Sequence, residues 1–127
     1  MTDAELKLIE SDLRLSLPPS YRSFVLSFPD ELAAAAGDFE FYSDASRLLT
    51  LNKELRKTPF FHGRPWPDRL FAIGENGCGD YYFLDLKDSY GAVMFVDHET
   101  MDYKRLAPNV AAWVPKLLEE KQNEKNA

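Results

Sequence analysis

The sequence has a single cysteine, Cys78, so no disulfide can form within the chain. Structural disulfides are typical of oxidising compartments, and their exclusion favours a reducing one. No apolar run reaches the roughly 20 residues that a membrane-spanning helix needs. The first residues, MTDAELK, do not have the pattern of a signal peptide. We therefore expect a cytoplasmic protein that does not enter a membrane.

Basic residues are also scarce. The 15 Lys and Arg residues stand against 21 Asp and Glu residues, which gives a formal net charge of −6. Binding to nucleic acid rests largely on neutralising phosphates with basic side chains, so this balance argues against a nucleic-acid partner. It is compatible with attraction to a basic protein, although mild acidity also serves solubility alone.

The length of 127 residues, with 45% apolar and 13% aromatic residues, corresponds to one domain with a substantial core. A domain of this size buries roughly two thirds of its unfolded surface, so its stability requires neither a metal nor a disulfide. We expect a single domain over residues 1–120. Residues 121–127 are polar and are expected to form a tail.

Two short amphipathic helices are predicted at the N-terminus. Thr2 and Glu5 have the spacing of a capping box, and Leu6 begins an apolar helical face. Pro18 and Pro19 end this helix and suit the first turn of the next, where apolar residues again recur at helical spacing.

The middle of the chain is more varied. Residues 31–37 are compatible with a short helix or a loop, and residues 39–42 are apolar enough for a strand. Ser43 is placed to cap a helix over residues 44–57. Residues 58–68 contain three prolines and three aromatic residues, a composition that predicts an ordered loop packed on the core rather than a linker.

The second half predicts a sheet followed by a helix. Residues 70–74, 81–86 and 92–97 are rich in β-branched, aromatic and apolar side chains, and residues 103–106 are a candidate fourth strand. A terminal helix is predicted from residue 110. Together these segments predict an α+β domain with a mainly antiparallel sheet of about four to five strands, two N-terminal helices, a middle helix and a C-terminal helix.

Acidic residues gather at the ends of the predicted strands. Seven of them lie between Glu75 and Asp102, and Lys87 is the only Lys or Arg among them. Such a cluster beside apolar strands predicts a surface that binds a basic partner. The candidate binding residues are Asp80, Tyr81, Tyr82, Asp85, Asp97, Glu99, Asp102 and Trp66. For Trp66, which lies in the Pro-rich loop, packing on the core is the competing interpretation.

Binding of a phosphate or a metal is disfavoured. The glycines between Gly74 and Asp80 precede a strand rather than a helix, and the acidic residues among them would repel a phosphate. Asp97, His98 and Glu99 could join Asp80 and Asp85 around a cation. No metal-binding motif with diagnostic spacing accompanies them, so we expect no cofactor.

Cys78 is the only candidate for a catalytic nucleophile. His98 or His62 could serve as its base, with Asp97 nearby. No third orienting group has a diagnostic spacing, and the local signatures of cysteine enzymes are absent. A small cysteine-dependent enzyme is therefore an alternative to the binding function, and we expect the chain not to be an enzyme.

The order of the segments resembles that of the SUKH superfamily (the Smi/Knr type). LIESDLRLSLPPSYRSFVLSF is similar to the family's two opening helices, joined by a Leu-Pro-x-x-Tyr hinge. FYSDASRLLTLNKELR is similar to the middle helix, LFAIGENGCGDYYFLDL to the central hairpin, AVMFVDHET to the next strand and LAPNVAAWVPKLLEE to the terminal helix. The matching positions are Leu17, Pro18, Tyr21, Asn52, Ile73, Gly74, Gly79, Asp80 and Asp85.

The resemblance implies an α+β fold, no catalysis and a protein partner. Most bacterial members of the family are regarded as immunity proteins, which bind and neutralise toxins, commonly nucleases, deployed between competing bacteria. A fungal branch acts in cell-wall regulation through protein contacts. The resemblance thus implies an immunity protein with a cognate toxin as its partner. A regulator or scaffold with an endogenous partner is the alternative.

Overall fold

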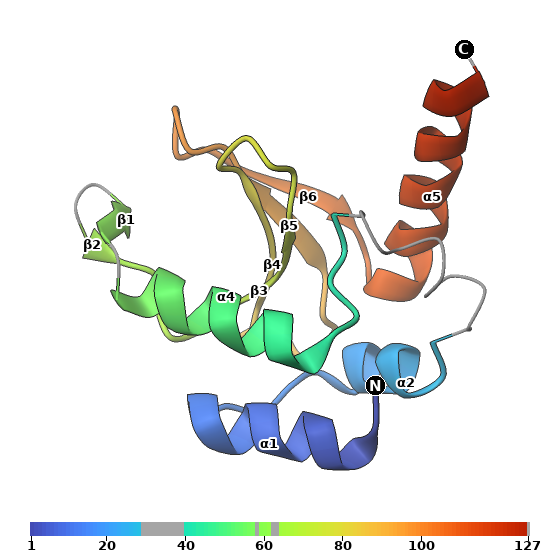
Figure 1. Cartoon of the computed structure of the whole chain (residues 1–127). Helices are drawn as coiled ribbons and strands as arrows, with labels where there is room; N and C mark the ends of the chain where they lie inside the picture. The colour runs from blue at the N-terminus through green and yellow to red at the C-terminus, as the bar shows by residue number, and fades with distance from the viewer. Residues whose placement is uncertain (29–39, 58, 62–63, 127) are drawn as a thin grey trace.

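The fold is seen in a computed structural model of the chain, which describes residues 1–28, 40–57, 59–61 and 64–126. In these residues, helices pack against an antiparallel sheet of four strands, as the sequence predicts (Figure 1). The predicted helix or loop over residues 31–37 lies outside the described part of the chain.

The four predicted helices are confirmed. They are α1 (Asp3–Leu13), α2 (Pro19–Leu26), α4 (Ala45–Lys57) and α5 (Val110–Asn126). The capping box of α1 is formed: the Thr2 Oγ1 accepts a hydrogen bond from the Glu5 backbone N–H at 3.1 Å, and the Glu5 carboxylate accepts one from the Thr2 N–H at 2.8 Å. Because α5 continues to Asn126, most of the predicted polar tail is helical.

The N-terminal cap of α4 differs from the prediction by one residue. Asp44, not Ser43, precedes the helix, and its Oδ1 accepts a hydrogen bond from the Ser46 N–H at 3.2 Å. Both residue types are good helix caps, and composition alone does not choose between two neighbouring ones.

The sheet has the strand order β3-β4-β5-β6, with every pair antiparallel. Its strands are β3 (Leu70–Glu75), β4 (Tyr81–Asp85), β5 (Val93–Val96) and β6 (Tyr103–Ala107), each within two residues of its predicted range. Consecutive strands are neighbours, so each connection is a short loop at one of the two ends of the sheet.

The described part of the Pro-rich segment before the sheet contains two short paired strands. The strands β1 (Pro59–Phe61) and β2 (Arg64–Pro65) pair antiparallel. The chain then returns to the body of the fold through Trp66, whose backbone N–H donates to the Leu55 carbonyl at 3.1 Å.

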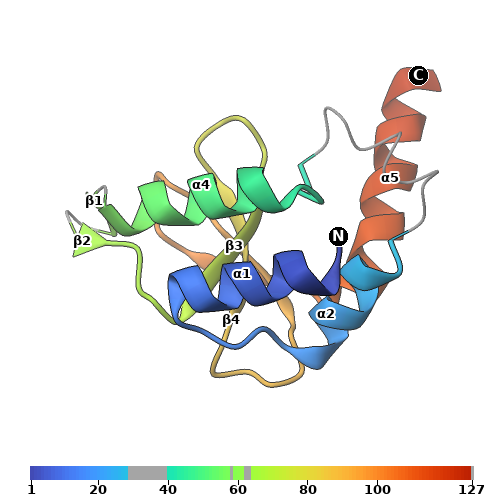
Figure 2. The same ribbon diagram turned by 60° about the horizontal axis from the view of Figure 1, so that its bottom comes forward.

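The helices cover the sheet from several sides. Figures 1 and 2 show α1 beside α4, and α4 running along β3. Helix α2 packs against α5. The core lies between these layers, where Tyr21 of α2 meets the Phe71 ring edge-on at a centroid distance of 5.7 Å. No helix of the described residues is long and apolar enough to cross a bilayer.

Asn52 covers the outer edge of β3. Its side chain is fully buried, its Nδ2 donates to the Ala72 carbonyl at 2.9 Å, and its Oδ1 accepts from the Ala72 N–H at 2.8 Å. The same amide also donates to the Leu48 carbonyl and accepts from Arg56 Nη1. All four of its hydrogen-bonding positions are therefore filled. An edge strand otherwise exposes backbone groups that can pair with another chain.

Residues 40–42 extend this cover along β3. The Glu75 N–H donates to the Glu40 carbonyl at 3.1 Å, and the Tyr42 N–H donates to the Ile73 carbonyl at 2.9 Å. Within the predicted strand over residues 39–42, the described part thus forms one isolated bridge, between Phe41 and Gly74. Gly74 is required there, because a Cβ at this position would lie 1.7 Å from the Glu40 oxygen.

We predict that Asn52→Ala lowers the free energy of unfolding by about 2–4 kcal/mol, because the Ala72 N–H and C=O each lose a buried partner at about 1–3 kcal/mol per group. Urea unfolding followed by circular dichroism measures the change. Glu54→Ala, on the exposed side of the same helix, is the matched control and should change stability by less than about 0.5 kcal/mol. Equal stabilities of the two variants would contradict the proposed role of Asn52.

The Tyr21 hydroxyl is buried and has no hydrogen-bond partner among the described residues. Burial raises the pKa of this phenol, so the group stays protonated. Tyr21→Phe keeps the ring and removes the unpaired hydroxyl, and we predict unchanged or higher stability, by up to about 1 kcal/mol. Urea unfolding measures this difference. A loss of more than about 1 kcal/mol would show that the hydroxyl has a partner after all.

Candidate functional site

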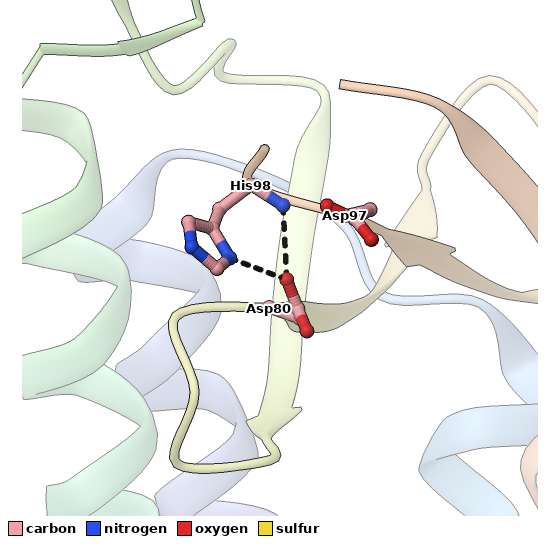
Figure 3. Close-up of side chains that lie close together, drawn as sticks. All are labelled: Asp80, Asp97 and His98. Atoms are coloured by element: carbon pink, nitrogen blue, oxygen red, sulfur yellow. Dashed lines mark hydrogen bonds and ion pairs between the residues drawn. The ribbon is translucent and has the colours of Figure 1, made fainter. Parts of the chain in front are cut away.

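Antiparallel pairing brings Asp80 and Asp97 to the same end of the sheet. Asp80 directly precedes β4 and Asp97 directly follows β5, and the adjoining residues Tyr81 and Val96 are register partners. Figure 3 shows the two carboxylates beside the imidazole of His98. One ligand atom from each of the three side chains lies within 4.8 Å of the others.

Three more acidic residues lie at this end. Glu75 is the last residue of β3 and the register partner of Tyr81. Glu99 and Asp102 lie in the turn between β5 and β6, which stands beside the turn between β3 and β4 at the top of Figure 1. We call this group the acidic end of the sheet: Glu75, Asp80, Asp97, Glu99 and Asp102.

Asp85 does not belong to the acidic end, although the sequence placed it in the same binding surface. It is the last residue of β4, and Asp80 precedes the first, so the two lie about 16 Å apart along the strand at about 3.3 Å per residue. Its carboxylate instead accepts from the Lys87 N–H at 3.0 Å and lies 3.8 Å from Arg69 Nε. Acidic residues at both ends of one strand face opposite ends of the sheet.

Trp66 is a core residue, so its placement among the candidate surface contacts is wrong. Its side chain is 2% exposed, and its ring packs edge-on against Tyr81 and Phe83 at centroid distances of 5.8 and 5.5 Å. The competing interpretation, packing on the core, is the one that the structure shows for Trp66. Burying a large apolar ring lowers the free energy of the folded protein more than leaving it exposed to water.

Tyr81 and Tyr82 lie on opposite faces of the sheet, because successive side chains of a strand alternate. Tyr82 packs against Trp113 of α5, at a centroid distance of 4.8 Å. Tyr81 lies on the opposite face of the sheet, where it packs edge-on against Trp66. Both rings are partly exposed. Of these two residues, only Tyr81 therefore shares a face of the sheet with Tyr103.

Tyr103 is a surface residue that the sequence analysis missed. It is the register partner of Val96, as is Tyr81, so the two tyrosines flank Val96 on one face beside the acidic end. The Tyr103 side chain is 47% exposed. Side chains of the predicted fourth strand alternate between the two faces of the sheet. This alternation could have identified Tyr103 once the register of the strand with β5 was known.

Asp80 ties two turns together. Its Oδ1 accepts hydrogen bonds from the His98 backbone N–H at 2.9 Å and from the His98 ring Nδ1 at 2.6 Å, and its Oδ2 accepts from Asn76 Nδ2 at 2.9 Å. The bond from the His98 backbone, followed by those from the His98 and Asn76 side chains, lowers the pKa of the Asp80 carboxyl. Asp80 is thus held ionised and joins the turn after β3 to the turn after β5.

Asp97 shapes the second of these turns. Its Oδ1 accepts from the Glu99 and Thr100 N–H groups at 2.8 and 3.3 Å. Glu99 has a side chain 79% exposed, and the Asp102 carboxylate makes no hydrogen bond or ion pair within the described ranges. Within the acidic end, Asp80 and Asp97 therefore bind backbone N–H groups. Glu99, whose carboxylate lies 3.9 Å from the His98 Nε2, and Asp102 are exposed.

A metal ion could be held only by Asp80, Asp97 and His98 among the described residues. The donor set of two carboxylates and one imidazole suits a divalent cation in type. However, the hydrogen bond between His98 Nδ1 and Asp80 occupies one ligand atom of each residue. The geometry matches an ion pair more closely than a metal centre.

Cys78 lies exposed in the turn between Gly77 and Gly79, both of which have positive φ angles. The His98 ring lies against Gly79, but no hydrogen bond joins it to Cys78 in the part of the chain that the structure describes. His62 lies outside that part. Within the described residues, the candidate nucleophile Cys78 and the candidate base His98 thus form no hydrogen-bonded pair.

The fold and this site define a small α+β protein with carboxylates gathered at one sheet end. A family model described as the SMI1 / KNR4 family (SUKH-1) matches residues 1–116. The chain belongs to this family, as the resemblance of its motifs indicated. Neither the curated proteins nor the solved structures include a significant match to it. Membership is consistent with a toxin-immunity or a cell-wall regulatory role.

We predict that His98 titrates above its usual pKa of about 6.5, because its hydrogen bond to Asp80 favours the protonated ring. Asp80→Asn should return the pKa of His98 towards that value. NMR titration of the His98 ring protons measures this pKa in the wild type and in the variant. The hydrogen bond from protonated His98 to Asp80, which raises the His98 pKa, stabilises the fold at low pH. This contribution is lost as the pH rises through the pKa of His98 in the folded protein. The hydrogen bonds from His98 and Asn76 to ionised Asp80, which lower the Asp80 pKa, stabilise the fold above about pH 4. Their contribution is lost when acid protonates the carboxylate.

Wild type should therefore exceed Asp80→Asn in stability most clearly between about pH 4 and 6.5. Urea unfolding across this range measures the difference. An identical His98 titration in the two proteins would show that the ion pair does not form in solution.

Proposed function

We propose that this protein is a non-catalytic binding protein whose acidic end contacts a basic protein partner, and that this partner is a toxin which it neutralises as an immunity protein. The observation that carries the proposal is the pair of exposed carboxylates, Glu99 and Asp102, on a turn fixed by Asp97 and Asp80. Membership of the SMI1 / KNR4 family supports it.

The arrangement suits recognition by charge. Solvent-facing carboxylates attract a basic surface over several ångströms and orient it before contact, which raises the association rate. The turn does not have to reorganise, because hydrogen bonds already fix its backbone. Tyr81 and Tyr103 lie next to the acidic end and provide the partly exposed aromatic area that usually dominates interface affinity.

A nuclease domain is the kind of toxin that fits best. Such a domain binds the phosphates of nucleic acid with basic side chains, so its substrate surface is positively charged. A protein with a net charge of −6 and an exposed acidic end complements that surface. Occluding it would block the substrate without any chemistry by the immunity protein.

Co-expression tests the function directly. The product of the gene adjacent to this one should arrest growth when expressed alone in bacteria, and growth should recover when this protein is co-expressed. Cys78→Ser should rescue growth equally well, which separates binding from a cysteine-dependent activity. A neighbouring product that is harmless alone would instead favour a regulator or scaffold with an endogenous partner.

Charge reversal at the exposed acidic positions should slow binding. For the double variant Glu99→Lys and Asp102→Lys, we predict an association rate constant for the toxin reduced by about tenfold or more at low salt, with a smaller effect on dissociation. The reduction should shrink as salt screens the charges. Surface plasmon resonance at several ionic strengths measures both rates.

Asp68→Lys is the matched control, since Asp68 is exposed and lies before the opposite end of β3. Its effect on the association rate should be small. Charge reversal at Asp80 and Asp97 is expected to weaken binding too, but it also removes hydrogen bonds of the turns and is the less specific test. Equal association rates for the double variant and wild type at low salt would refute the proposed contact.

A further inference from the structure

The loop between β4 and β5 borders a hollow at the end of the sheet opposite the acidic end. The hollow has a volume of about 770 Å³, and its walls include Ser20 of α2, Met94 of β5, Arg105 of β6 and Tyr90 of the loop. Figure 2 shows this loop beside α2 at the bottom of the molecule. The volume falls in the range of sites that bind small ligands or the side chains of a partner.

Hydrogen bonds fix the loop in place. The Ser20 hydroxyl donates to the Tyr90 carbonyl at 3.0 Å, and the Asp88 carboxylate accepts from the Tyr90 and Ala92 N–H groups at 3.0 and 3.2 Å. Gly91 has a φ of 76°, and a Cβ there would lie 2.6 Å from the Ser20 hydroxyl oxygen. The loop is thus both hydrogen-bonded and closely packed against α2.

This fixed loop presents Tyr90 to solvent with 82% of its surface exposed. A single exposed aromatic residue is ordinary on a protein surface. An aromatic residue beside a hollow, on a backbone that needs no reordering, is the usual form of a binding anchor, because little conformational entropy is lost when it is covered.

Arg105 provides a charge without a partner. It is the register partner of Met94 and is exposed, and its guanidinium makes no hydrogen bond or ion pair with the residues that the structure describes. The one carboxylate in the wall, Asp88, already accepts two backbone N–H groups. The hollow therefore combines apolar surface with a cation that is free to bind an anion.

We propose that this hollow binds a segment of a protein partner that carries an aromatic side chain next to an Asp or Glu. The aromatic ring packs against Tyr90 and Met94, and the carboxylate binds Arg105. A guanidinium recognises a carboxylate through two parallel hydrogen bonds, which gives direction as well as affinity. This surface selects an acidic segment, so it differs in chemistry and position from the acidic end and does not depend on the toxin proposal.

A peptide titration tests this site. The probe is the acetylated, amidated tetrapeptide Gly-Asp-Phe-Gly, and the matched probe replaces its Asp with Asn. Titrated into the ¹⁵N-labelled protein, the Asp peptide should shift the amide signals of Tyr90, Met94 and Arg105 and saturate in the millimolar range or below. The Asn peptide should bind about tenfold more weakly, because it cannot form the charged pair.

Variants assign the two parts of the recognition. Arg105→Gln should weaken the Asp peptide to the level of the Asn peptide, and Tyr90→Ala should weaken both. Lys104→Gln removes a neighbouring exposed charge whose side chain lies on the other face of the sheet, and it should change neither. Equal binding of the two peptides, shifts confined to the acidic end, or no shifts at 10 mM peptide (a value of the order expected for weak sites) would each overturn the proposal.

Discussion

Asn52 replaces a further strand along the outer edge of β3. Its buried amide forms the two hydrogen bonds to Ala72 that a neighbouring strand would form, and it is anchored to α4 by its bond to the Leu48 carbonyl. Because all four hydrogen-bonding positions of the amide are filled, it fixes α4 against β3. The register of β4 with β3 and with β5 decides which residues reach each end of the sheet.

Side-chain hydrogen bonds also hold the acidic end together. Asp80 comes from the turn after β3, and His98 comes from the turn after β5, so their hydrogen bonds join two turns that are distant in sequence. Asp97 then fixes the second turn from inside. The Asp80 and Asp97 carboxylates are thus partly committed to structure, whereas the Glu99 and Asp102 carboxylates are exposed and, in the proposed function, contact the partner. One acidic cluster thus contains residues with two different tasks.

Local patterns in the sequence determine most of the fold, because helix periodicity, capping residues and strand composition act over short ranges. The capping box of Thr2 and the four sheet strands were predictable in this way. The binding surface was less predictable, because it depends on which ends and faces the strands share. Asp85 is close to Asp80 in sequence but lies at the other end of β4, and Tyr103 became a candidate only through its register with Val96. Trp66 was ambiguous because an aromatic residue in a Pro-rich loop suits either burial or contact.

The two ends of the sheet differ in charge, and this difference makes the central claim testable in one measurement. Hydrogen exchange, compared with and without the cognate toxin, reports which backbone segments the partner covers. The account predicts added protection in the turns over residues 76–80 and 97–102, together with the start of β6. Protection confined to the loop over residues 86–92, with no change in those two turns, would contradict it.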